Sequence, residues 1–556
     1  MKQLRFILLL GLFAVMPLSV IHAIDLNIES PHVMAETMPD STELFIASRV
    51  GTDWITELDA VLVALYDKLP DNLDIERQTI DSVFRDGFNK NGLDWDLFLG
   101  LLGDYAAIGL EPMTTFNDDE EPFATVVIEI TDQKAVEVLF DVMTAESGDD
   151  VTRSMEGDVI RYDNVGKDHA TVYITSTHII ATTNPSYSLN PSSPLSASSD
   201  FTDALSLLNE DHYNVLAYAS KATVEAALSD GDTEGLQAFG LSPQDASPLV
   251  AGFTFQDDNT FTTDIAMGST ATAPNSTVSI SYLNAMPAST DAFIVASDFT
   301  NLYNNIITTA QEIATAEGSR DNPETMIPLM FRLTGLDLEE DVLSWTTGGY
   351  GIFLGADVMS IVNEVVTTDN LSELNIEAGL VIEATDIDLA RNTAAELGKF
   401  LALASGDNDE VTVTQTELNG LPATLVSLDV PAKRDNPPFA IELVLTVTDD
   451  FLFFGTRSAF DSIVSGDTLA DNADFISTVP QLLDNPTSVW YTNADGLLIP
   501  TIFGLNNDGG RTGLNDPTQI LDVLESFDDI LTSMTFSTAI DDAGVIRLRG
   551  TMSLNP

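Results

Sequence analysis

The chain has 556 residues, of which 44% are hydrophobic, 87 are Asp or Glu and 22 are Lys or Arg. Its length and hydrophobic content predict several compact domains, and its formal net charge of −65 repels nucleic acids and anionic lipid headgroups, so we expect no nucleic-acid partner. The sequence contains no Cys, which excludes disulfides, thiol catalysis and thiolate metal sites.

Residues 1–23 have the layout of a secretory signal peptide. Lys2 and Arg5 precede an apolar run from Phe6 to about Val20, and Ala23 offers a small residue for cleavage. The alternative is an uncleaved membrane anchor, although the run is shorter than the roughly 20 residues of a spanning helix. No later segment is long and apolar enough to cross a bilayer. We therefore expect no transmembrane segment in the mature chain, and an extracellular, periplasmic or cell-envelope location.

The sequence contains an internal repeat. "MPDSTELFIAS" at Met38–Ser48 returns as "MPASTDAFIVAS" at Met286–Ser297, and "VVIEITD" at Val126–Asp132 returns as "LVIEATD" at Leu380–Asp386. A Gly-Leu-Asp triplet, the "NVLAY"/"SVWY" strings and the final strands follow in the same order. This order predicts two homologous halves, residues 35–268 and 284–556, joined by a linker at 269–283.

In the first half, "LFIAS" has strand composition, and the apolar spacing after Thr52-Asp53 predicts a helix. The strands "DYAAIGL" and "TVVIEITD" come next, followed by a helix at Gln133–Ala145. "DVIRYDNV", "ATVYITS", "HIIATT" and two strands across "QDDN" complete the half. Short polar connections between strands favour hairpins. We expect an α+β protein in which each half is a large, mostly antiparallel sheet with helices packed on one face.

The second half repeats this plan. A helix is expected after Thr300-Asn301, and Asp337 with Glu340 makes an Asp variant of the capping box. "TRSAFDSIVSG" predicts a short helix, whereas the corresponding stretch of the first half is rich in Pro and Ser and predicts a long loop at Asn184–Asp200. A loop added to one copy is a natural place for an acquired function, and solvent-exposed filler is the alternative.

Residues for catalysis are scarce. The mature chain has four histidines and no HExxH, GxSxG, SxxK, P-loop or GxGxxG motif. The sequence therefore indicates no catalytic, cofactor-binding or metal-ligating residue, and we expect a protein that is not an enzyme. Acids are so abundant that a paired-acid hydrolase stays open as an alternative. The histidines are His32, His169, His178 and His212.

Two acidic turns are weak calcium candidates. Asp230–Gly235 has oxygen ligands at alternate positions and a Gly at the sixth, as an EF-hand loop does, but its twelfth position is Leu241. "NNDGG" at Asn506–Gly510 is weaker still. Polar turns are the preferred interpretation of both, as solvation is of the overall acidity, and divalent cations stay a weaker alternative.

The signal peptide, the "MP.ST..FI" strand, the 556-residue length and the two divergent halves together resemble the exported bacterial family catalogued as domain of unknown function 3352 (DUF3352). The resemblance implies export and this architecture, and it transfers no residue role. Our leading hypothesis is a non-enzymatic secreted or cell-envelope binding or scaffolding protein. The alternatives are a carrier of an apolar, lipid-like ligand and a calcium-dependent adhesion or surface protein.

Overall fold

The computed structural model describes residues 31–555 except 69–76, 91–93, 112–121, 148–150, 166–168, 211, 230–245, 256–259, 269–276, 279, 298, most of 301–330, 347, 357–375, 407–409, 432–438, 497–529 and 542. The chain divides into two compact units, Met1–Ala273 with Ile540–Pro556, and Pro274–Ala539. Helices and antiparallel strands make up both, so the α+β class is confirmed.

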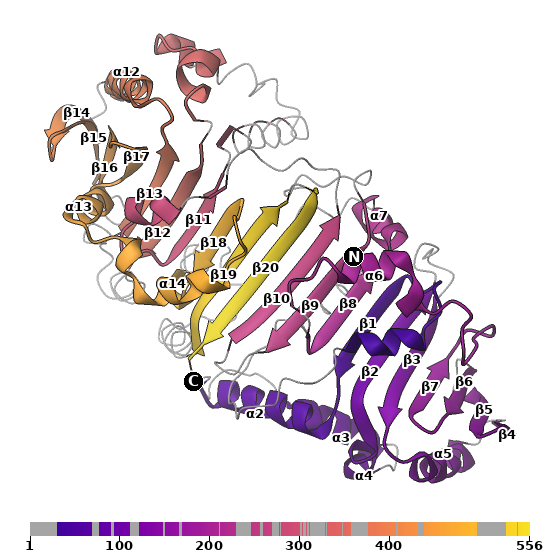
Figure 1. Cartoon of the computed structure of the whole chain (residues 1–556). Coiled ribbons are helices and arrows are strands. Elements are labelled where there is room, and N and C mark those ends of the chain that lie inside the picture. The colour runs from indigo at the N-terminus through magenta and orange to yellow at the C-terminus, as the bar shows by residue number, and fades with distance from the viewer. Residues whose placement is uncertain are drawn as a thin grey trace. The chain divides into compact units, whose positions relative to one another are not determined.

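The described strands of the first unit pair antiparallel throughout (Figure 1). Hairpins form at both ends, because two to six polar residues join sequential strands. Across the sheet the order is β4 (Thr152–Glu156), β5 (Val159–Val165), β6 (Ala170–Ile174), β7 (His178–Thr182), β3 (Phe123–Ile130), β2 (Leu102–Glu111), β1 (Leu44–Arg49), β8 (Val215–Ala219), β9 (Leu249–Phe255), β10 (Thr260–Gly268) and β20 (Val545–Leu554).

The C-terminal strand differs from the boundaries expected from the sequence. Residues 284–556 were expected to form one half, but β20 pairs with β10 from Thr260↔Ser553 to Gly268↔Val545 and belongs to the first unit. The repeated pattern predicts the strand itself, whereas its partner depends on contacts that no local pattern encodes. The expected linker also ends early, since η4 (Ile280–Ala285) is a 3₁₀ helix within the core of the second unit.

The second unit follows the same strand order over its described strands, again antiparallel. Its nine described strands correspond one to one, in their order across the sheet, to the first nine strands of the order given above, which begins with β4 and reaches β9. The order is β14 (Val411–Leu418), β15 (Leu421–Val430), β16 (Phe439–Val447), β17 (Phe451–Thr456), β13 (Ile376–Glu383), β12 (Tyr350–Ala356), β11 (Ala292–Ala296), β18 (Ser488–Thr492) and β19 (Leu531–Ile540).

In each unit, helices cover both faces of the sheet, which corrects the expectation of one covered face. In the first unit, adjacent residues of β7 enter different cores: Ile180 packs with η1 (Pro31–Glu36), η2 (Leu195–Ala197) and α6 (Ser199–Leu205), whereas Ile179 packs with α5 (Gln133–Ser147). Neighbouring side chains of a strand point to opposite faces. Helical periodicity predicts α5 but does not specify which face of the sheet the helix covers.

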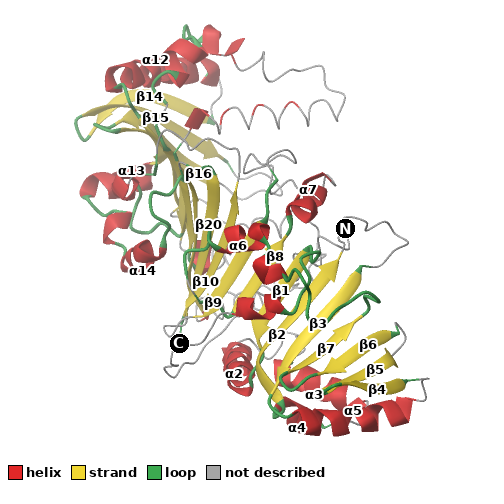
Figure 2. Ribbon diagram, turned by 45° about the vertical axis from the view of Figure 1, so that its right-hand side comes forward, coloured by secondary structure: helices red, strands yellow, loops and turns green. Residues whose placement is uncertain are grey.

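The second unit is arranged in the same way. Phe453 packs with η4, α13 (Arg457–Ser465), η6 (Leu469–Asp471) and α14 (Ala473–Thr478). The neighbouring Leu452 packs with α12 (Ile387–Ser405) and with Trp345, which follows η5 (Leu338–Leu343). Figure 2 shows α13 and α14 together and α12 at the β14–β15 end. The remaining described helices are α2 (Thr52–Lys68), α3 (Ile80–Lys90), α4 (Trp95–Leu99), α7 (Lys221–Ser229) and η7 (Val479–Gln481).

The structure confirms the cap predicted at Asp337 and the short helix predicted in the second half. Asp337 caps η5 by accepting from the N–H groups of Glu339 and Glu340. Its own N–H, however, donates to the carboxylate of Asp341 (2.7 Å) and not to the side chain of Glu340, which the capping box had predicted as the acceptor. The short helix predicted in "TRSAFDSIVSG" is α13, which ends at Gly466 with φ of 88°. The helix expected after Thr300 lies largely outside the described residues.

The Pro/Ser-rich segment at 184–200 packs against the first unit and is not solvent-exposed filler. Leu195 is fully buried, and the Tyr187 hydroxyl donates to the carbonyl of Thr37 (2.8 Å). Leu195 N–H also donates to the carbonyl of Met38 (2.8 Å), as Leu469 N–H does to Met286 (2.9 Å). The loop therefore hydrogen-bonds to the opening motif of the first unit, as η6 does to the opening motif of the second unit.

Candidate functional site

In each unit, the strand of the opening motif places apolar side chains on both faces of the sheet. Phe45 and Phe293 point into the cores beneath η1 and η4, and the next residues, Ile46 and Ile294, point to the opposite face. We call this opposite face the open face. The repeated "FI" thus marks a central strand with apolar side chains on both of its sides.

The open face of the second unit carries a continuous apolar row, which we call the ridge. Cross-strand pairs join its members in sequence: Phe536↔Trp490, Trp490↔Ile294, Ile294↔Ile352, Ile352↔Leu380 and Leu380↔Phe454. The Trp490 and Phe536 rings stack at 4.9 Å between centroids. Such pairs are side by side on the sheet surface, so the ridge crosses six adjacent strands.

Three ridge residues are exposed. Ile294 and Ile352 are each 46% exposed and Phe454 is 37% exposed. Leu380 is part-buried and packs against the core beneath α12, in which Tyr350, Ile382 and Leu452 are buried. The ridge therefore runs beside a helix-covered part of the same face.

No charged residue occupies the open face of these six described strands. Their alternate positions are apolar or hydroxyl-bearing, although charged residues make up 20% of the chain. The glutamates of β13, Glu377 and Glu383, point to the other face. The open-face residues are Ala292, Ile294, Ala296, Tyr350, Ile352, Leu354, Ala356, Ile376, Ala378, Leu380, Ile382, Leu452, Phe454, Thr456, Ser488, Trp490, Thr492, Thr532, Met534, Phe536, Thr538 and Ile540.

The first unit carries a shallower version of this row across seven strands. All of its members are apolar and part-exposed, and small alanines stand at its centre. At one end α7 covers the face, where Val224 packs with Met267 and Ile546. The row runs through Val126, Ile108, Ile46, Ala217, Ala251, Ile265 and Leu548.

The serine of the opening motif has a structural task in each unit. Ser41 hydrogen-bonds the buried carboxylate of Glu111, which also accepts from Asn184 Nδ2 (2.8 Å). Ser289 hydrogen-bonds the buried carboxylate of Glu377, which also accepts from Ser462 Oγ (2.7 Å). Neutral donors satisfy the hydrogen-bonding capacity of both carboxylates. Each buried carboxylate therefore links the opening motif to the segment that packs over it. The sequence alone gave no signal for this pairing.

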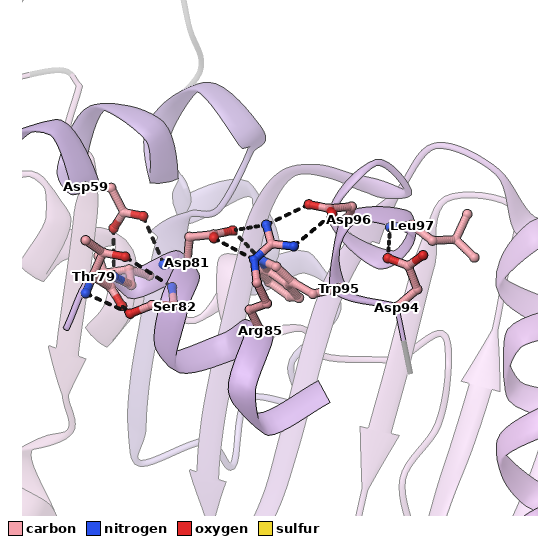
Figure 3. Close-up of polar contacts among 10 residues, drawn as sticks. Asp59, Thr79, Asp81, Ser82, Arg85, Asp94, Trp95, Asp96 and Leu97 are labelled. Atoms are coloured by element: carbon pink, nitrogen blue, oxygen red, sulfur yellow. Dashed lines mark hydrogen bonds and ion pairs between the residues drawn. The ribbon is translucent and has the colours of Figure 1, made fainter. Parts of the chain in front are cut away.

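A polar cluster joins α2, α3 and α4 (Figure 3). The Arg85 guanidinium donates to both Asp81 (3.0 Å) and Asp96 (2.7 Å), and the Trp95 indole donates to Asp81 Oδ1 (2.6 Å). The hydrogen bond from Arg85 lowers the pKa of Asp96, and burial raises the pKa of Asp59, which accepts from the first N–H groups of α3. These bonds orient three helices relative to one another, so we interpret the cluster as structural.

The histidines lie on separate elements of the first unit. His178 Nδ1 lies 2.9 Å from the hydroxyl of Thr177, and burial lowers the pKa of His178. His32, His169 and His212 are exposed. No group of His, Asp or Glu among the described residues could hold a metal ion. Both calcium candidates, Asp230–Gly235 and Asn506–Gly510, lie outside the described residues.

An apolar hollow of about 410 Å³ lies among η4, η6, α14 and η7 of the second unit. None of its described lining residues is titratable. Its described lining is Leu283, Asn284, Ala470, Ile476, Val479 and Pro480. Among the described helices, none is long and apolar enough to pass through a bilayer.

Fold and site together define an α+β protein with wide antiparallel pairing of strands, whose second unit keeps an uncharged, part-exposed apolar face over its described strands. The chain matches a family model over residues 77–502, and it belongs to that family, described as a protein of unknown function (DUF3352). The sequence resemblance to this family is thereby confirmed. No curated protein and no solved structure matches the chain.

Proposed function

We propose that this is a non-enzymatic binding or scaffolding protein, secreted or held in the cell envelope, whose open sheet faces form its binding surface. The observation that carries the proposal is the ridge, because exposed Ile294, Ile352 and Phe454 occupy one uncharged surface of an otherwise acidic chain. Covering apolar surface is favourable by about 25 cal/mol per Å². Contiguous exposed apolar surface of this kind marks interaction sites.

The proposal includes an origin by duplication, which would give the protein two related surfaces. The shared strand order supports it, as do the matching contacts of the two opening motifs. One further pair of equivalent hydrogen bonds supports it: Glu129 accepts from Asp104 N–H (2.8 Å), and Glu383 accepts from Gly349 N–H (3.2 Å). The expected export from residues 1–23 would place both surfaces outside the cytoplasm.

Binding of the neutral dye Nile red, whose emission rises in apolar surroundings, tests the proposal. Ile294→Ser on the ridge should weaken dye binding several-fold, because it removes exposed apolar area at the centre of the surface. Leu333→Ser is the matched control, since Leu333 is 72% exposed and lies off the sheet. Equal binding by both variants would contradict the proposal, as would saturable hydrolysis of glycosides, esters or peptides by the purified chain.

A further inference from the structure

We infer that the ridge of the second unit binds one extended hydrocarbon chain of a neutral, single-chain lipid-like molecule. This inference rests on the proposed function and names the ligand of its surface. The chain would lie across the strands, along Phe536, Trp490, Ile294, Ile352, Leu380 and Phe454.

The dimensions of the ridge suit a single chain. Five interstrand spacings of about 4.8 Å give a length of about 24 Å. A lipid chain spans half of a bilayer core, about 15 Å, so one chain fits within the ridge. Exposure is concentrated in one row, because Tyr350, Ile382 and Leu452 beside it are buried with α12. A partner helix with its side chains is about 10 Å wide, which exceeds a row one residue across.

The chemistry of the face determines the headgroup. Ser488 and Thr538 lie beside the Trp490–Phe536 stack, with their hydroxyl oxygens 2.6 Å apart. Hydroxyls can bond a neutral hydroxyl or ester group at this end. The described open-face positions offer no cation for a carboxylate or phosphate, and the net charge of −65 opposes anionic ligands.

The same charge argues against a second copy of the chain as the occupant. Two copies would each bring −65 formal charges to the contact, and the ridge has no charged groups to offset their repulsion. A neutral amphiphile avoids this cost and still covers the exposed side chains.

Fluorescence quenching by a brominated monoacylglycerol, used below its critical micelle concentration, tests the inference on the full chain. Trp490 is part-exposed, while Trp54, Trp95 and Trp345 are only 4%, 2% and 2% exposed. Bromine on the acyl chain should quench a saturable fraction of the emission, and Trp490→Phe should abolish that fraction. Equal quenching in Trp490→Phe would overturn the inference.

Charged variants locate the chain along the ridge. Ile352→Asp should weaken the apparent affinity at least tenfold, whereas Leu403→Asp should leave it unchanged, because Leu403 is 81% exposed on α12 and off the ridge. Trp490→Phe keeps the test decisive if Ile352→Asp fails to fold. If Nile red binding depends on Ile294 but the acyl probe never quenches Trp490, the inference fails while the proposed function stands. A brominated anionic fatty acid that binds as tightly as the acylglycerol would overturn the neutral headgroup.

Discussion

Removing the positive charge of Arg549 should destabilise the region around β10 and β20. Arg549 forms a two-pronged ion pair with Asp264 at 2.7 and 2.9 Å, and the Tyr213 hydroxyl donates to the same carboxylate at 3.0 Å. The two side chains are 15% and 3% exposed, and the hydrogen bond to Asp264 raises the pKa of Arg549. Arg549→Met leaves Asp264 as a buried charge with one neutral donor.

Breaking a buried pair in this way costs about 3–5 kcal/mol. Because total stability is typically about 5–15 kcal/mol, the variant should lose a large share of it. The double variant Asp264→Asn with Arg549→Met should recover most of the loss, since it removes the uncompensated charge. Arg457→Met is the control: its exposed pair with Asp461 on α13 should contribute about 0.3–0.5 kcal/mol.

Guanidinium denaturation followed by amide hydrogen exchange of β10 and β20 measures the effect where it is expected. Protection of these two strands should fall in Arg549→Met and return in the double variant. A loss below about 0.5 kcal/mol, or a double variant no more stable than the single one, would refute the assignment of this pair as the fastener of the C-terminal strand.

Three further predictions concern packing, capping and pH. Gly252→Ala should destabilise the chain by about 1–3 kcal/mol in denaturant titrations, because its Cβ would lie 2.3 Å from the Tyr213 ring; an unchanged midpoint would contradict this packing. Asp386→Ala should cost about 1 kcal/mol, because Asp386 caps α12 through Leu389 N–H (3.0 Å), and Asp388→Ala is the control in the same titration. Burial raises the pKa of Tyr162 and of Tyr218 to about 12; because the folded state holds these protons more tightly, stability should be full below pH 10 and decline as the pH rises towards 12. Tyr162→Phe should reduce that decline, and phenolate absorbance of folded protein that titrates fully near pH 10 would count against it.

Alternation in the sequence predicted most of the strands because β2, β3, β5 to β7 and β15 to β17 are rich in β-branched and apolar residues. Two edge strands were not predicted from the sequence. β4 is exposed along its whole length and β14 is exposed over most of its length, so neither strand shows an alternating buried side. The cap at Asp337 could be predicted because a capping bond is local.

The ridge could not be read from sequence because it depends on register. Ile294 and Phe293 look alike in "AFIVAS", and only the pairing with Ile352 and Trp490 shows which one joins the row. One signal was available: β11, β12, β17, β18 and β19 carry no charge at any position. Strands of an acidic chain that are uncharged on both sides indicate that neither face is designed for water alone.

Site-specific labelling tests the central claim most directly. A neutral aryl diazirine, photolysed with the full chain and mapped by peptide mass spectrometry, should insert mainly into 292–296, 350–356 and 488–492, and excess brominated monoacylglycerol should protect these peptides. Labelling concentrated instead on the exposed leucines Leu329, Leu333 and Leu403, with no protection of the ridge peptides, would contradict the account.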